Sequence, residues 1–393
     1  MHHKKRWVAA AITVALVAAC GGGDPYVPGT GSPAGAPTTK GAFTSVVSFG
    51  DSLTDAGTYA PATSFAGNGT PPFMGGRFTN NSETATVWVE NLAKSLGLIT
   101  TVAEMGFAGT SVKCPAAANP ALASTCTAYA QGGARVTDPI GIGKDGGALT
   151  VPMSTQISNH LARFGGFKST DLVILFGGNN DVFVQATTLS MQAAGIQANA
   201  AAGKITADQA KGLLLDAQLA AQGELKKAAL ALSGYVKDQI LAKGAKYVMV
   251  WNLPDSSQTP YGSTLSAEGK QTLSTLVDTF NLWLREGLKD QPVQLVDAHT
   301  MFKEVYNNKS KYGIANNTHP ACDAAKIQVI TAGAITDGSS LFCNSTPNVP
   351  FNGMRDGADA NTWQFADGVH PTTGGHKVLS DLAYKLLQSY GWI

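Results

Sequence analysis

Residues 45–57, SVVSFGDSLTDAG, decide the fold that we expect of this 393-residue chain. Their first five residues are apolar and valine-rich, which is typical of a buried strand, and Gly50 and Asp51 form the turn that ends it. A short helix is predicted from about Leu53. A strand that passes through a tight turn into a helix is the repeating unit of α/β folds, so the sequence predicts a parallel sheet covered by helices.

Further apolar runs predict the rest of the sheet. They are DLVILF at 171–176, KYVMVW at 246–251, VQLV at 293–296 and a shorter candidate at 101–105. The segments between them have helical periodicity. This alternation predicts one domain, from residue 43 to residue 393.

Two insertions interrupt this pattern. The first, at about 184–242, is rich in alanine and leucine, and Gly203 and Gly234 break its helical part. We expect an alanine-rich helical hairpin that covers the sheet or forms a lid. The second, at about 309–361, holds turn residues and two cysteines, and we expect a disulfide-stapled loop rather than a separate domain.

The amino terminus has the pattern of an export signal. MHHKKRW is basic, VAAAITVALVAA is apolar but short for a membrane span, and both precede Cys20. Residues 16–20, LVAAC, resemble a bacterial lipobox, which predicts cleavage after residue 19 and a lipid on Cys20. Residues 20–42 then form a flexible Gly/Pro/Ser/Thr tether. We expect an envelope lipoprotein anchored to the membrane or, if Cys20 is not lipidated, a periplasmic or extracellular protein.

The charge balance excludes a strongly basic surface. The formal net charge is +1, and without Lys4, Lys5 and Arg6 of the leader the remaining 25 basic and 27 acidic residues give −2. Nucleic acids are bound through clusters of lysine and arginine, so no nucleic-acid partner is expected. The oligomeric state cannot be read from the sequence.

Four cysteines remain once Cys20 is set aside. Sequence proximity favours disulfides between Cys114 and Cys126 and between Cys322 and Cys343, although four cysteines allow three connectivities. Such bonds suit an exported protein. A metal site is not predicted, because the sequence has neither a CxxC pair nor an HExxH segment.

Ser52 and His370 are the candidates for nucleophilic catalysis. Ser52 follows a strand at the edge of the sheet where ligands gather in doubly wound folds, although serine also caps helices there. A serine nucleophile needs a histidine base held by a third group. Among the seven histidines, His370 has an acid, Asp367, three residues before it and Pro371 after it. His376 is expected on the surface of the following helix.

Two later segments can supply donors for an oxyanion. Gly133 in AQGGA allows close approach to a backbone N–H, although Gly132 is adjacent and a tight turn is the alternative. Asn180 in GGNND follows a predicted strand, and its side-chain amide can donate. Both segments follow Ser52 and precede His370, as loops at one edge of a sheet would.

Together these segments resemble the SGNH, or GDSL-type, hydrolase family. The matching blocks are FGDSLTDAG at 49–57, AQGGA at 130–134, GNND at 178–181 and DGVHP at 367–371, and the resemblance extends over about 46–387. It implies a three-layer α/β/α sandwich with a central parallel, flavodoxin-like sheet. It also implies that no cofactor is needed.

The resemblance gives each candidate a role. Ser52 would be the nucleophile, Asp367 and His370 would complete a catalytic triad, and Ser52, Gly133 and Asn180 would form the oxyanion hole. The implied activity is that of a serine carboxylester hydrolase, an esterase or lipase acting on a small-molecule or lipid ester. A phospholipase, an acyltransferase and a polysaccharide acetylesterase of the same fold are alternatives. A catalytically silent cell-surface binding lipoprotein is the alternative of another class.

Overall fold

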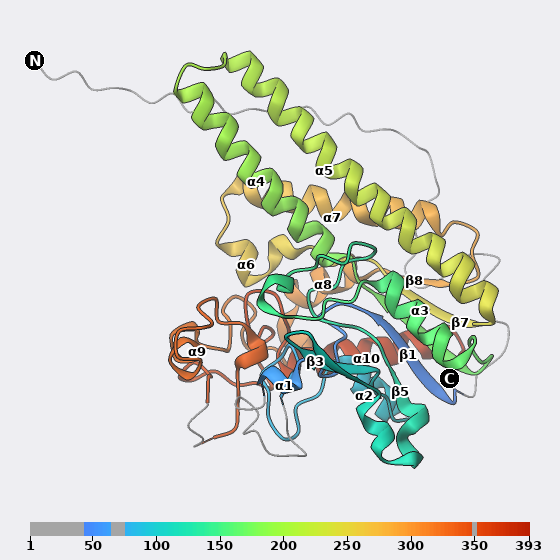
Figure 1. Ribbon diagram of the computed structural model, residues 1–393. Helices are drawn as coiled ribbons and strands as arrows, with labels where there is room; N and C mark the ends of the chain where they lie inside the picture. Colours follow the sequence, from blue (N-terminus) through green and yellow to red (C-terminus); the bar gives the residue numbers. More distant parts are fainter. Residues whose placement is uncertain (1–42, 64–74, 348–351) are drawn as a thin grey trace, which may run out of the picture.

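The computed structural model describes residues 43–63, 75–347 and 352–393 (Figure 1). The predicted export signal, Cys20 and the tether lie outside the described residues, so they stay predictions.

Six parallel strands form the central sheet in the order β2-β5-β1-β6-β7-β8. The strands are β1 (Ser45–Gly50), β2 (Thr101–Val102), β5 (Cys126–Ala128), β6 (Asp171–Phe176), β7 (Tyr247–Trp251) and β8 (Gln294–Val296). Apart from the edge strand β2, this is the strand order of flavodoxin-like sheets. The chain crosses to opposite sides of β1 to form β5 and β6, so the carboxyl ends of β1 and β6 mark the switch point where such sheets bind ligands.

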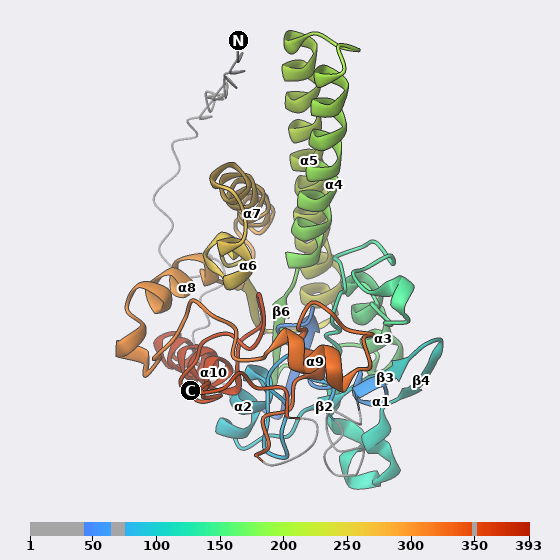
Figure 2. The ribbon, with the colours of Figure 1, turned by 90° about the vertical axis from the view of Figure 1, so that its left-hand side faces the viewer.

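Helices cover both faces of the sheet (Figures 1 and 2). Alternate strand residues point to opposite faces. Val47 and Val173 pack in one core cluster with residues of α3, α5 and α7, whereas Val46 and Leu172 pack in another with residues of α2 and α10. The three-layer α/β/α sandwich is therefore confirmed. The helices are α1 (Ala60–Thr63), α2 (Trp88–Ser95), α3 (Met153–Phe164), α4 (Asn179–Ala201), α5 (Ala207–Tyr235), α6 (Pro260–Ser263), α7 (Ala267–Gly287), α8 (Ala298–Asn307), α9 (Ala324–Ile330) and α10 (Thr373–Ser389).

The predicted helical hairpin exists, but it begins earlier than expected. α4 starts at Asn179 rather than near residue 184, and α5 continues through Gly234 before a π-helical turn at Val236–Ile240. Gly203, with a φ of +69°, does lie at the tip between the two helices. The base of α5 packs on the sheet and on α7, while the outer half of the hairpin projects from the body as an arm (Figure 2).

Part of the strand structure differs from the prediction. The segment predicted as one strand at 101–105 is divided between β2 and β3 (Glu104–Phe107), and β3 pairs with β4 (Thr110–Lys113) in a separate antiparallel hairpin. β5 was not predicted, because its three residues, Cys-Thr-Ala, are too few to form an apolar run.

Both expected disulfides are present, joining Cys114 to Cys126 and Cys322 to Cys343. The second joins cysteines that are 21 positions apart, and the segment between them contains α9 and a 3₁₀ turn at Ser340–Phe342. This segment, residues 322–343, is called the stapled segment below. Ile327 and both cysteines of this segment pack in a small separate core cluster with Met354 and Ala366, which lie outside the segment.

In the described ranges, no helix is both long enough and apolar enough to cross a bilayer. No group of three or more histidine, cysteine, aspartate or glutamate side chains in these ranges is arranged to hold a metal ion.

Candidate active site

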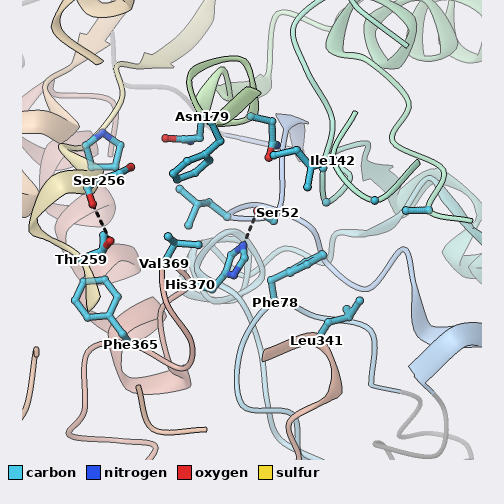
Figure 3. Close-up of a pocket in the computed structure, with 18 of the residues that line it drawn as sticks. Ser52, Phe78, Ile142, Asn179, Ser256, Thr259, Leu341, Phe365, Val369 and His370 are labelled. Atoms are coloured by element: carbon cyan, nitrogen blue, oxygen red, sulfur yellow. Dashed lines mark hydrogen bonds between the residues drawn. The ribbon is translucent and has the colours of Figure 1, made fainter. Parts of the chain in front are cut away.

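Ser52, His370 and Asp367 form a continuous hydrogen-bonded chain, of which Figure 3 shows the bond between Ser52 and His370. The Nε2 atom of His370 lies 2.8 Å from the Oγ atom of Ser52, and its Nδ1 atom lies 2.9 Å and 2.8 Å from the two Asp367 oxygens. Ser52 follows β1, whereas the other two residues belong to the turn before α10. The structure thus brings Ser52 to a histidine that lies 318 positions later in the sequence.

Gly50 is what allows Ser52 to reach this place. A Cβ atom at Gly50 would lie 2.0 Å from the carbonyl oxygen of Phe176, so only glycine lets the end of β1 lie this close to the end of β6. The backbone then turns sharply, because the Asp51 carboxylate accepts a hydrogen bond from the Leu53 N–H. Ser52 is left at the mouth of a cavity, with 9% of its surface exposed.

The electrostatics of the pair favour a charged, oriented histidine. Burial by itself would lower the pKa of His370, but the Asp367 carboxylate outweighs it and raises that pKa above its ordinary value of 6.5. Burial would conversely raise the pKa of Asp367. The charge of His370 and hydrogen bonds from His370, Ser340 and Val369 instead hold it below its usual range, so the carboxylate stays ionised.

The backbone N–H groups of Ser52, Gly132 and Gly133, residues that all line the cavity, differ in whether an acceptor is within reach. The Gly132 N–H donates to Asp55 at 2.8 Å, whereas for the N–H groups of Ser52 and Gly133 no acceptor lies in range within the described part of the chain. Gly133 has a φ of +76°, and a Cβ atom there would collide with the Ile142 carbonyl oxygen at 2.0 Å. Both glycines line the cavity, but only the second keeps an unused N–H.

The side-chain amides of the two asparagines differ in the same respect. The side-chain amide of Asn179 donates to Asp51 at 3.0 Å. Asn180 uses one amide hydrogen on the Ala134 carbonyl at 2.9 Å, and its second hydrogen remains available at the cavity. Both residues lie in the first turn of the 23-residue helix α4, where the helix dipole favours negative charge.

Buried carboxylates tie the three strand-end loops to one another. Asp51 binds Asn179, which joins the loops after β1 and β6, and Asp55 accepts from Gly57, Thr58 and Gly132, which joins the loops after β1 and β5. Burial raises the pKa of both Asp51 and Asp55 to about 6, and the hydrogen bonds that they accept limit the increase.

Asp181 closes the third pair of loops. One of its oxygens accepts from the Val136 N–H at 2.9 Å, and the other accepts from Arg135 at 3.1 Å, which joins the loop after β6 to the loop after β5. Burial raises the pKa of this carboxyl, against the opposing effects of Val136 and Arg135. The sequence predicts a turn at Asp51 but none of these contacts between loops, although Asp51, Asp55 and Asp181 stand inside the FGDSLTDAG and GNND segments.

A cavity of about 380 Å³ opens beside the Ser52 hydroxyl. In Figure 3, Phe78 and Ile142 lie on one side of Ser52 and His370, and Phe365, Ser256 and Thr259 lie on the other. The apolar lining consists of Leu53, Tyr59, Phe78, Phe107, Ile142, Ala148, Phe183, Pro254, Phe302, Tyr306, Ile335, Leu341, Phe342, Phe365 and Val369. Of the residues in this lining, Ile335, Leu341 and Phe342 belong to the stapled segment.

The prediction that His376 lies on the helix surface is wrong. Its side chain is fully buried, with Nδ1 accepting from the Trp88 N–H at 3.3 Å and Nε2 lying 3.4 Å from the Phe78 carbonyl oxygen. Burial lowers the pKa of His376 to about 3, so it is neutral. The helix starts with two glycines, which let its first turn pack tightly against Asn361 and Gln364 and carry the histidine inward.

Comparison with known proteins places the chain among acyl hydrolases. Residues 46–383 match the family model described as GDSL-like Lipase/Acylhydrolase. The chain is 30% identical over 149 residues to an uncharacterized protein in the trpE-trpG intergenic region of Pseudomonas putida, an alignment covering 37% of this chain and 22% of that protein. It is 27% identical over 147 residues to esterase EstA of Pseudomonas aeruginosa, covering 37% of this chain and 20% of the esterase.

The aligned part therefore spans about a fifth of the length of these curated relatives. Among solved structures, the crystal structure of an extracellular lipase from Streptomyces rimosus aligns with 88% of this chain and 99% of its own, at a TM-score of 0.36 and 14% identity.

Proposed function

Because this chain belongs to the family of GDSL-like lipases and acylhydrolases, we propose that it is a serine carboxylester hydrolase that cleaves acyl esters through an acyl-enzyme on Ser52. The observation that carries the proposal is the hydrogen-bonded chain from Asp367 through His370 to Ser52, which ends at a cavity where unused donors converge. Helix capping by a serine does not require a histidine base that is oriented by a carboxylate.

In the first half-reaction, His370 takes the Ser52 proton as Oγ attacks the ester carbonyl carbon. The N–H groups of Ser52 and Gly133 and the free amide hydrogen of Asn180 donate to the resulting oxyanion. When the C–O bond breaks, His370 returns the proton to the leaving alkoxide, and the alcohol departs. The ionised Asp367 stabilises the imidazolium that exists between these two transfers.

In the second half-reaction, water replaces the alcohol. His370 takes a proton from the water as its oxygen attacks the acyl-enzyme, and the same three donors hold the second oxyanion. His370 then protonates Ser52 Oγ as the acyl bond breaks, so that a carboxylic acid leaves and the free enzyme is restored.

The lining of the cavity supports a substrate ester whose acyl group is apolar. Aromatic and aliphatic side chains dominate its lining, and such surfaces gain free energy when they cover hydrocarbon. We therefore propose aliphatic or lipidic esters as the substrate class. Transfer of the acyl group to an added alcohol, measured alongside hydrolysis, distinguishes the acyltransferase alternative.

The experiment that tests this function is hydrolysis of p-nitrophenyl esters by the full chain in detergent. We expect Ser52→Ala to lower kcat by at least about 10³-fold, because the nucleophile is lost. Ser158→Ala, at an exposed position of α3, is the matched control. A fluorophosphonate probe should label wild type but not Ser52→Ala. Hydrolysis at the wild-type rate by Ser52→Ala would contradict the proposal.

We also propose that the chain is exported and lipidated on Cys20. Residues 1–19 would be the export signal, 20–42 the lipidated cysteine and tether, and 43–393 a single hydrolase domain. Two disulfides in the folded domain support an oxidising compartment. Metabolic labelling with palmitate tests the anchor, since Cys20→Ser should abolish both the label and recovery in the membrane fraction.

A further inference from the structure

Ser340 donates to the catalytic carboxylate from outside the catalytic turn. Its backbone N–H lies 2.8 Å from Oδ2 of Asp367, and its side chain is fully buried. The other donors to Asp367 are His370, through its ring and its backbone N–H, and the Val369 N–H, and both residues belong to the same turn as the carboxylate. Within the described ranges, Ser340 is thus the one hydrogen-bond donor to the Asp367 carboxylate from another part of the chain.

The stapled segment holds Ser340 in this position through a covalent bond and backbone contacts. Cys343, three residues after Ser340, is bonded to Cys322, and the Cys322 N–H donates to the carbonyl oxygen of Ala366 at 2.8 Å. Ala366 directly precedes Asp367. The disulfide therefore joins the donor side of the contact to the acceptor side, with few residues between the bond and either partner.

Asn81 holds the segment from its other side. The Asn81 N–H donates to the Cys343 carbonyl oxygen at 2.7 Å, and its side-chain amide lies 3.3 Å from the carbonyl oxygens of Ser340 and Leu341. Asn81 is buried, so these bonds are shielded from water. The 3₁₀ turn that begins at Ser340 has little freedom to rotate its N–H away.

We propose that Ser340 is a positioning residue for catalysis, whose backbone N–H fixes the Asp367 carboxylate, and that the Cys322–Cys343 disulfide keeps this N–H in place. The inference rests on the proposed esterase function. If a carboxylate accepts hydrogen bonds only from its own turn, the carboxylate can rotate about its side-chain bonds. The histidine that it orients would then move with it. A donor from a second, covalently tied segment fixes the plane of the carboxylate, and with it the direction of His370 Nε2 toward Ser52.

Ser340→Pro tests the donor directly, because proline has no N–H. Ser340 is the first residue of its 3₁₀ turn, a position that suits proline, and Ser339 has φ −48° and ψ 126°, which is allowed before proline. Ser340→Ala keeps the N–H and is the matched control. Relative to Ser340→Ala, we expect kcat of Ser340→Pro to fall about tenfold with KM changed less than about twofold, as for loss of a bond to a charged group.

Two readouts distinguish positioning from general damage. In the Asp367→Ala background, Ser340→Pro should cause no further loss of kcat, because the two changes act on one contact. The low-field proton resonance of His370 Nδ1 should shift in Ser340→Pro but stay in place in Ser340→Ala. An unmoved resonance, or an undiminished effect of Ser340→Pro in the Asp367→Ala background, would overturn the proposal.

If Ser340→Pro does not fold, Cys322→Ser/Cys343→Ser replaces it. We expect hydrogen-exchange protection of the Ser340 N–H and kcat to fall together. Protection that is lost while kcat is retained would overturn the proposal. The esterase function is tested separately, since Ser52-dependent hydrolysis by wild type can hold while either outcome at Ser340 is found.

Discussion

The two sides of the reaction centre are held in place by different means. Ser52, Gly133 and Asn180 stand on loops that leave adjacent parallel strands, and buried carboxylates such as Asp55 tie those loops together. We call this the oxyanion side. His370 stands instead on a turn that contacts the stapled segment, outside the sheet, and we call this the base side.

The difference indicates which structural features set the geometry of each side. On the oxyanion side, the sheet sets the spacing of the loops, and the carboxylates only adjust their orientation. The base side does not directly follow a strand, and its turn is held in part by hydrogen bonds to the stapled segment and by the Cys322–Cys343 bond. We therefore expect single donors to dominate catalysis on the oxyanion side and the disulfide to dominate on the base side.

Among changes that leave Ser52 and His370 in place, the largest effect is expected from Asn180→Ala. Removal of one oxyanion donor should lower kcat by roughly 10²- to 10³-fold with little change in KM, because the donor acts mainly on the transition state. Steady-state hydrolysis of a p-nitrophenyl ester measures it, and Asn199→Ala, exposed in the same helix, is the control. A loss that appears mainly in KM would show that Asn180 binds the substrate rather than the oxyanion. That result would contradict the role given to the oxyanion side.

The two disulfides give the next largest contrast. Replacing either pair with serines should lower the free energy of unfolding by about 2 to 4 kcal/mol, since the loops they close are of similar length. Only the Cys322/Cys343 replacement should also lower kcat, by about tenfold, because only that pair lies beside Asp367. Urea unfolding and steady-state kinetics measure both quantities. Equal kcat in the two variants would remove the distinction between the two sides.

The pH dependence of kcat/KM should report on the base side alone. The pKa of His370 is raised above 6.5, and the protonated ring cannot act as a base, so kcat/KM should fall as the pH falls through a midpoint above 6.5. Asp367→Asn removes the charge that raises this pKa. The midpoint should then move to lower pH, while the activity of the plateau also falls. A midpoint that stays in place would assign the limb to another group.

The smallest effect concerns His376, which lies behind the base side. Its folded pKa of about 3 is below the value of 6.5 expected when unfolded, so between these pH values the unfolded chain binds the extra proton. Stability should fall as the pH falls below 6.5, by up to about 1.4 kcal/mol per pH unit from this group. Urea unfolding at pH 7 and pH 5 should show a smaller loss in His376→Gln than in wild type. Parallel losses would show that His376 is protonated in the folded state.

Much of the fold could be predicted because its central strands are long apolar runs. Asp171–Phe176 is a strand over the predicted residues, and β1 extends the predicted run only by Gly50. The start of α4 could not be predicted in the same way, since Asn179, Asn180 and Asp181 are typical turn residues. In the structure their side chains are engaged by Asp51, Ala134 and Arg135, and the backbone is free to be helical.

The residues of the candidate site likewise include some that could be predicted from the sequence and some that could not. Ser52, Gly133, Asn180, Asp367 and His370 stand in short blocks that the sequence displays. In the structure all but Asp367 line one cavity, and Asp367 binds His370 from behind it. Ser340 could not have been found, because the bond that it donates to Asp367 comes from its backbone N–H, and every residue but proline has one. His376 was misplaced for a related reason, since its partners are the backbone groups of Trp88 and Phe78.

The arm formed by α4 and α5 has a consequence for engineering. At about 1.5 Å per residue, the 23 residues of α4 carry the chain roughly 34 Å from Asn180 to the tip of the arm. The tip, at residues 202–206, is exposed or half-buried and touches no part of the cavity. A fluorescent domain or an affinity tag inserted there would leave the reaction centre untouched. The arm therefore offers an internal fusion site that keeps both ends of the polypeptide free.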